Sequence, residues 1–195
     1  MSNRVTGGPP HDGDDPLPAW ISLPRRIYLD TSTLQMLYDF GGVIWDGEPL
    51  QPVGRAANVK DLGDELDALQ RIFLVNQRAC FQFAVTEASL QEVEGRDEPR
   101  YTRWVYDVLD IWLLQSAGEK SPARGNTFED RRFGMISAKD RRLLQDALDW
   151  RCDGFMTMER RLPTAAEFVE RTTGLRVVRP SAYWGQLERW ANLYY

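Results

Sequence analysis

The 195-residue chain contains very little histidine and cysteine. Its one histidine, His11, lies in a segment rich in Pro, Gly and Asp, so no Ser–His or Cys–His catalytic pair can be built from it. The two cysteines, Cys80 and Cys152, show neither metal-finger spacing nor a disulfide framework, which is typical of proteins from a reducing compartment. These scarcities exclude histidine catalysis and a disulfide scaffold.

Long apolar runs are also missing. The most hydrophobic helix-like stretch, Trp104 to Leu114, is interrupted by Asp107 and Asp110, whereas a membrane-spanning helix needs about 20 apolar residues. The first twenty residues are rich in Pro, Gly and Asp and lack the apolar core of a secretory signal. We therefore expect a soluble cytoplasmic protein with no membrane partner.

The chain also lacks a net positive charge. The formal net charge of −5 argues against a general nucleic-acid coat, but an enzyme that binds nucleic acid through bound cations stays open. Only Lys60, Lys120 and Lys139 are lysines, so nearly all of the positive charge is arginine. A compositional habit of the source organism explains this arginine bias equally well.

The length suits one domain, since domains usually have ~100–200 residues. Residues 1–24 include "GGPPHDGDDPLP" and are expected to form a flexible N-terminal arm, so that residues 25–195 make up the folded domain. The turn-rich segment "GGVIWDGEPLQPVGR" predicts a loop insertion at about residues 41–57. Residues 118–134 predict a second, polar loop.

Four short apolar runs are typical of buried strands, and they cover residues 26–30, 79–85, 154–158 and 175–180. Helical patterns separate them, at residues 32–40, 59–75, 86–93, 101–114, 137–152 and 163–174, and a last helix carries Trp184 to Leu193. The pattern contains no hairpin signals. It therefore predicts an α/β fold with three α/β/α layers and a mainly parallel central sheet.

Four carboxylates stand at one edge of this predicted sheet. Asp30 ends the first strand, Glu87 follows the second, Asp140 lies in the first turn of the helix before the third, and Glu159 follows the third. Functional groups gather at the carboxyl ends of parallel strands. Clustered carboxylates repel one another, so hard cations such as Mg²⁺ or Mn²⁺ would stabilise them. Two such ions can activate a water molecule and stabilise the leaving oxygen in the hydrolysis of a phosphodiester.

The segments "IYLDTSTL", "FAVTEASLQEV", "KDRRLLQDAL" and "GFMTMERRL" resemble, in this order, the four acidic motifs of the PIN-domain family. That family includes the ribonuclease toxins of VapBC toxin–antitoxin systems. The resemblance covers roughly residues 25–180. One departure is Thr157-Met158-Glu159, where the family more commonly carries Thr-Asn-Asp.

The resemblance implies an endoribonuclease that needs Mg²⁺ or Mn²⁺ (one or two ions) and leaves a 5′-phosphate and a 3′-hydroxyl. It also implies structured RNA, such as tRNA or rRNA, as the substrate, an antitoxin protein as a partner, and homodimers. In this interpretation Asp30 and Asp140 hold the main ion, while Glu87 and Glu159 complete the cluster or bind a second ion. Asp146 is a poorer candidate than Asp140 because it lies in the middle of its helix.

Further residues are expected to support this site. Thr31, Ser32 and Thr157 are expected to orient the carboxylates through hydrogen bonds. Arginine pairs beside or upstream of the acids are candidates for RNA phosphate contacts, since a guanidinium binds phosphate in bidentate fashion: Arg131, Arg132, Arg141, Arg142, Arg160 and Arg161.

Ordinary structural roles stay open for all of these residues. Asp30 suits a helix N-cap, Glu87 and Asp140 suit the positive ends of helices, and Glu159 suits a solvated surface. The arginine pairs equally suit a solvated helix face. A group of aromatic residues near the C-terminus could stack RNA bases, but helical spacing favours core or dimer contacts: Trp184, Trp190, Tyr194 and Tyr195.

Two other functions stay open. The first is a PIN-fold interaction module without catalytic turnover, which would fail to bind Mn²⁺. The second is a phosphatase of the haloacid dehalogenase type. That family has Asp-x-Asp at the end of its first strand, whereas this chain has Asp30-Thr31-Ser32.

Overall fold

Four parallel strands form one sheet in the computed structural model, which describes residues 20–51, 60–79, 81–111 and 127–191. The strand order is β2-β1-β3-β4, and every neighbouring pair is parallel. The strands are β1 Arg26–Leu29, β2 Gln82–Ala84, β3 Gly154–Met156 and β4 Arg176–Val178. The predicted α/β fold with a parallel central sheet is therefore confirmed.

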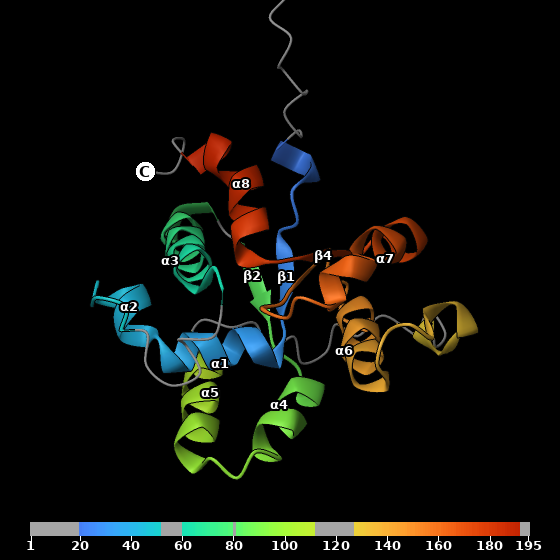
Figure 1. Ribbon diagram of the computed structural model, residues 1–195, viewed down its shortest axis with the longest axis horizontal. Helices are drawn as coiled ribbons and strands as arrows, with labels where there is room; N and C mark the ends of the chain where they lie inside the picture. The colour runs from blue at the N-terminus through green and yellow to red at the C-terminus, as the bar shows by residue number, and fades with distance from the viewer. Residues whose placement is uncertain (1–19, 52–59, 80, 112–126, 192–195) are drawn as a thin grey trace, which may run out of the picture.

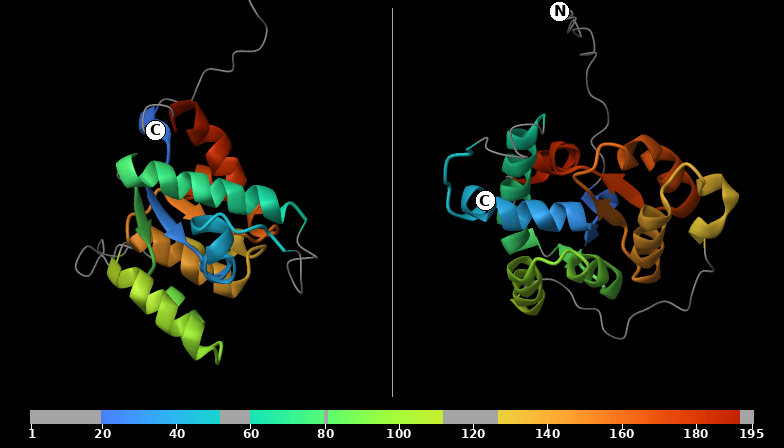
Figure 2. Two further views of the ribbon diagram at one scale, coloured as in Figure 1. Left: turned by 90° about the vertical axis from the view of Figure 1, so that its left-hand side faces the viewer. Right: turned by 60° about the horizontal axis from the view of Figure 1, so that its bottom comes forward.

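Helices cover both faces of this sheet (Figures 1 and 2). One hydrophobic cluster lies beneath α1 Thr31–Asp39, α2 Gly41–Trp45, α3 Leu62–Ala79, α5 Pro99–Ile111 and α8 Pro180–Ala191. A second cluster, on the other face, lies beneath α6 Ala138–Asp149 and α7 Ala166–Thr173. The left view of Figure 2 shows α3 crossing in front of the sheet. Helix α4, Glu87–Glu94, contributes to both clusters from the edge.

The central strand β1 explains why the two clusters are separate. Ile27 and Leu29 belong to the first cluster and Tyr28 to the second, because side chains alternate between the two faces of a strand. All three are fully buried, as expected for a parallel strand covered on both faces. At the amino end of β3, a Cβ atom on Gly154 would come within 2.8 Å of the Pro24 side chain, so a glycine is needed there.

Three predicted segments need correction. Residues 20–24 belong to the folded body, since Trp20–Ser22 forms a 3₁₀ turn and Leu23 is buried. Part of the predicted 41–57 loop is the short helix α2, whose Ile44 reaches the core. Part of the predicted 118–134 loop forms two 3₁₀ turns that bury Phe128 and Phe133. Residues 1–19, 52–57 and 118–126 of these predictions lie outside the described residues.

A buried carboxylate joins α3 to α8. Glu65, in the first turn of α3, is 1% exposed. Its carboxylate accepts hydrogen bonds from the backbone N–H of Ser181 at 2.9 Å and from the Ser181 hydroxyl at 2.6 Å, and it lies 3.0 Å from Nη2 of Arg179. Because α8 begins at Pro180, Glu65 satisfies an N–H of its first turn from outside the helix.

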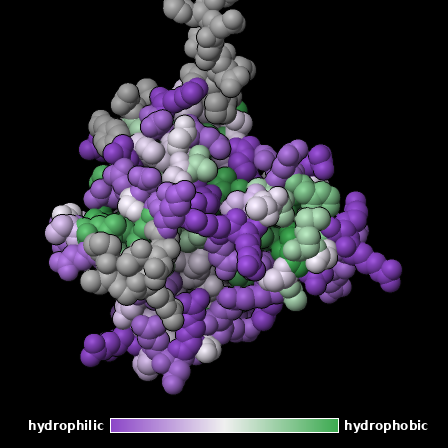
Figure 3. All heavy atoms as spheres, in the orientation of Figure 1, coloured by the Kyte–Doolittle hydropathy of each residue, from purple (hydrophilic) through white to green (hydrophobic). Residues whose placement is uncertain are grey.

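The aromatic residues of α8 contribute to packing. Trp184 and Trp190 are partly buried against the first cluster, and the rings of Trp190 and Trp20 lie 6.1 Å apart. The interpretation as core residues therefore holds for these two, while Tyr194 and Tyr195 lie outside the described residues. The face shown in Figure 3 is mostly hydrophilic, with smaller hydrophobic areas near α2 and α7. None of the described helices is both long enough and apolar enough to cross a membrane.

Candidate functional site

The candidate site lies at the carboxyl ends of β1 and β3, which are neighbours in the sheet. The chain leaves β1 through α1 toward β2 on one side, whereas it leaves β3 through α7 toward β4 on the other. Ligands of parallel α/β sheets bind where connections diverge in this way. Figures 1 and 2 show the helices that surround this edge, namely α1, α4 and α6.

Asp30 lies at the centre of the site and is 5% exposed. It is the N-cap of α1, because Oδ1 accepts hydrogen bonds from the backbone N–H groups of Ser32 at 2.6 Å and Thr33 at 3.0 Å. The capping role that the sequence left open for Asp30 is therefore present in the structure. Burial raises the pKa of this carboxyl, although hydrogen bonds from Ser32, Thr157 and Thr33 partly offset the effect. A nearby cation would stabilise the ionised form of a carboxylate that is so little exposed to water.

The raised pKa of Asp30 predicts an unusual pH dependence in metal-free protein. Because the folded pKa lies above the ordinary value of 3.8, the folded state binds the proton more tightly, and this contribution to stability falls as the pH rises through the folded pKa. In EDTA, Asp30→Asn should therefore melt at a higher temperature than wild type at about pH 7, and the difference should shrink toward about pH 4. Thermal melts over this range would measure it. A pH-independent difference would contradict the prediction.

Ser32 and Thr157 connect Asp30 to the chain after β3. The Ser32 hydroxyl donates to Oδ1 of Asp30 at 2.6 Å and accepts the backbone N–H of Met158 at 3.0 Å. The Thr157 hydroxyl lies 3.4 Å from that of Ser32 and accepts the backbone N–H of Glu159 at 3.0 Å. Both hydroxyls therefore contact the acidic segments, as the sequence predicts.

Glu92, which the sequence pattern did not single out, is the carboxylate that α4 brings to this site. It accepts a hydrogen bond from the Thr31 hydroxyl at 2.8 Å, and its Oε2 lies 3.0 Å from Nζ of Lys139. Its side chain is only 15% exposed. The sequence carries a signal for it: Glu92 follows Ala88 by four residues and Ser89 by three, so it lies on the buried face of the helix.

Asp140 and Glu159 line a hollow of about 380 Å³ beside this cluster. The Ser137 hydroxyl caps α6 by accepting the backbone N–H of Asp140, and it also donates to Oδ2 of Asp140 at 2.7 Å. Partial desolvation raises the pKa of Glu159, and the charges of Asp140, Asp30 and Glu92 raise it further, whereas Lys139 lowers it. Asp140, Asp30 and Glu92 are therefore close enough to Glu159 to act on it electrostatically. We call Asp30, Glu92, Asp140 and Glu159 the acid cluster.

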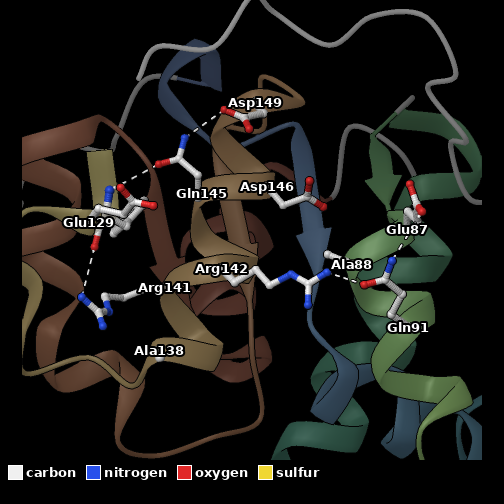
Figure 4. A pocket seen from close by; sticks show the side chains of 11 residues that line it. Glu87, Ala88, Gln91, Glu129, Ala138, Arg141, Arg142, Gln145, Asp146 and Asp149 are labelled. Atoms are coloured by element: carbon white, nitrogen blue, oxygen red, sulfur yellow. Dashed lines mark hydrogen bonds between the residues drawn. The ribbon is translucent and has the colours of Figure 1, made fainter. Parts of the chain in front are cut away.

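Glu87 does not join the acid cluster, which corrects the prediction. It starts α4 and lines a different hollow, of about 540 Å³, between α4 and α6 (Figure 4). Its neighbours there include Gln91, Arg142 and Asp146. The physical reason is the length of α4. Glu87 and Glu92 are separated by more than one helical turn, and it is Glu92 that lies at the N-terminal end of α6, beside Lys139.

Asp146, which lines this second hollow, has a structural role. Its carboxylate accepts a hydrogen bond from the Thr86 hydroxyl and lies 3.5 Å from the Tyr28 hydroxyl. The Tyr28 hydroxyl also bonds Ser89 at 2.7 Å, and burial raises the pKa of Tyr28. This network joins β1, α4 and α6.

Most of the predicted RNA-binding arginines have partners within the protein. Arg132 forms an ion pair with Asp130 at 2.9 Å, and Arg160 forms one with Asp61 at 3.4 Å. Arg141 donates to the Phe128 carbonyl at 3.4 Å, and Arg142 donates to the Gln91 side chain (Figure 4). Arg131 and Arg161 form no side-chain hydrogen bond or ion pair with the described residues, and Arg161 lines the hollow beside the acid cluster. The structure thus distinguishes Arg161 from the other five.

The acid cluster suits a hard divalent cation in its chemistry. It offers only carboxylate oxygens. Desolvation is the main cause of the raised pKa of Glu159, and the charges of Asp140, Asp30 and Glu92 add a repulsion that a cation would relieve. As the side chains stand, no three carboxylate, histidine or cysteine groups among the described residues are grouped closely enough to hold one ion. Asp140 is partly exposed and Glu159 is exposed, so cation binding would require these side chains to reorient.

Comparisons of the chain with family models, with curated proteins and with solved structures found no match.

Proposed function

We propose that the protein is a PIN-like ribonuclease that depends on Mg²⁺ or Mn²⁺ and hydrolyses RNA phosphodiester bonds at the acid cluster. The observation that carries the proposal is the position of Asp30 and Glu159 after the neighbouring strands β1 and β3, where the connections of the parallel sheet diverge, with Glu92 and Asp140 close enough to act on Glu159 electrostatically. Structured RNA as substrate, an antitoxin partner and homodimers are further proposals that rest on the motif resemblance alone.

The residues of the cluster divide the work in this proposal. Asp30, which is buried at the end of β1, and Asp140 would hold the cation, while Glu92 and Glu159 would complete its surroundings. A bound divalent cation supplies charge neutralisation at the phosphate and activation of a water molecule. Ser32 and Thr157 hold the Asp30 carboxylate in place. Lys139 already compensates Glu92 and lies where it could also face a phosphate.

The direct test is cleavage of total RNA and transfer RNA with Mn²⁺, Mg²⁺ or EDTA. We expect cleavage with either metal and none with EDTA. Isothermal titration with Mn²⁺ alone would measure metal binding without catalysis. Absence of both cleavage and Mn²⁺ binding would contradict the nuclease and favour the interaction module in its place.

A matched pair of substitutions on α4 tests which glutamate belongs to the site. Glu92→Gln should lower the rate of metal-dependent cleavage by about 10- to 100-fold, the range typical for residues that support metal ligands. Glu87→Gln should leave the rate near that of wild type, since Glu87 lines the other hollow. Single-turnover cleavage of a labelled RNA would measure both. The reverse order of effects would restore Glu87 and remove Glu92 from the site.

A further inference from the structure

The hollow beside the acid cluster has the chemistry of a nucleotide site. Its volume of about 380 Å³ falls within the ~300–1,000 Å³ typical of small-ligand sites. Asp140 and Glu159 form one part of its wall, which places it directly next to the acid cluster. We call it the flanking hollow. A group bound in it would lie beside any phosphate held at the acid cluster.

One side of the flanking hollow offers an unused cation. Arg161 lines it, is exposed, and forms no side-chain hydrogen bond or ion pair with the described residues. A guanidinium without such a partner can bind phosphate with two parallel hydrogen bonds. Lys139 also lines the hollow but lies 3.0 Å from Glu92, so Arg161 is the better phosphate ligand.

Apart from Ser137 and Thr164, the remaining lining is apolar. Ile136 and Leu162, 5% and 4% exposed, lie at the hollow, and Met135 beside them is 73% exposed. An exposed methionine next to buried aliphatic side chains offers a soft, polarisable surface to a flat aromatic ring. An apolar surface with one available cation beside it matches the two parts of a nucleotide, the base and the phosphate.

We propose that the flanking hollow holds the RNA nucleotide next to the scissile phosphate, with Arg161 binding a neighbouring phosphate and Met135 contacting the base. This proposal rests on the proposed function of the acid cluster. Lys139 is paired with Glu92, so Arg161 alone faces the charges of Asp140 and Glu159, and RNA should enter well only when a divalent cation neutralises these carboxylates. An unpaired base is required, because the apolar surface must reach its face.

The test measures RNA binding separately from cleavage. Fluorescence anisotropy would follow a labelled single-stranded RNA with hydrolysis-resistant phosphorothioate linkages, in Mg²⁺, at several salt concentrations. We expect Arg161→Ala to weaken binding about 10-fold and to reduce the salt slope of log K by about 0.7, the value for one phosphate contact on a single strand. Arg161→Lys should restore part of both. Met135→Ala should weaken binding without changing the salt slope.

Arg189→Ala is the matched control, because Arg189, in the last turn of α8, is also exposed and forms no side-chain hydrogen bond or ion pair with the described residues, but lies outside the flanking hollow. It should bind RNA as wild type does. The proposal is overturned if wild type binds no RNA, if Arg161→Ala keeps the wild-type affinity and salt slope, or if Arg189→Ala has the same effect. Failure of the ribonuclease itself looks different: RNA binding would depend on Arg161 while no metal supports cleavage.

Discussion

Asp30→Asn is expected to abolish metal-dependent RNA cleavage while the protein stays folded. Asparagine keeps an oxygen that can accept the N–H groups of Ser32 and Thr33, so the cap of α1 survives. The change removes the negative charge on which cation binding depends. Because residues that merely support metal ligands contribute about 10- to 100-fold, loss of a ligand should lower the rate by more than ~100-fold.

The matched control is Asp39→Asn, at the other end of the same helix. Asp39 is exposed and accepts a hydrogen bond from the Gln35 side chain at 2.9 Å, outside the acid cluster. This variant should cleave RNA at the wild-type rate. Equal cleavage by wild type and Asp30→Asn would show that the activity comes from a contaminant or from another site, and Asp30 would then be a helix cap only.

Glu65→Ala should destabilise the fold far more than the removal of a surface charge does. Removing one partner of a buried ion pair typically costs about 3–5 kcal/mol, since the other partner is left without compensation. Arg179 would lose its carboxylate and Ser181 its acceptor. For a chain of this size the loss corresponds to a decrease in Tm of about 6–20 °C. Urea unfolding followed by circular dichroism would measure it.

Asp67→Ala, on the exposed side of α3, is the control for Glu65. Asp67 pairs with Arg71 at 3.0 Å, but both side chains are about half exposed. Such i,i+4 surface pairs contribute only about 0.3–0.5 kcal/mol. Equal effects of the two substitutions would mean that Glu65 contributes no more than a surface charge, and that α8 does not depend on it.

The sheet could be predicted from the sequence because its signal is local. Each of the four strands lies in a short apolar run, and burial on both faces requires such a run. Asp30 could be found for the same reason: a carboxylate followed by hydroxyl residues marks the start of a helix whether or not it also binds a cation. Helix α2 was missed because two glycines, poor helix formers, begin it.

Glu92 and the arginines could not be assigned by position in the sequence. Glu87 is the first acid after β2, but the direction of α4 decides which acid reaches Asp140, and that direction depends on packing against α5 and α6. Similarly, Arg160 and Arg161 are neighbours in sequence, yet Arg160 pairs with Asp61, 99 residues away, while Arg161 lines the flanking hollow. Contacts between residues so far apart in the sequence leave no local sequence pattern from which they could be predicted.

The hydrogen bond between the Ser32 hydroxyl and the N–H of Met158 spans 126 residues of sequence. During synthesis on the ribosome, α1 is therefore translated long before the segment that completes its surroundings. Asp30 can cap its own helix early, but Asp140 and Glu159 join it only after most of the chain has emerged. A nascent or prematurely terminated chain that ends before β3 lacks the acid cluster, so the order of translation by itself delays assembly of the site until the fold is nearly complete.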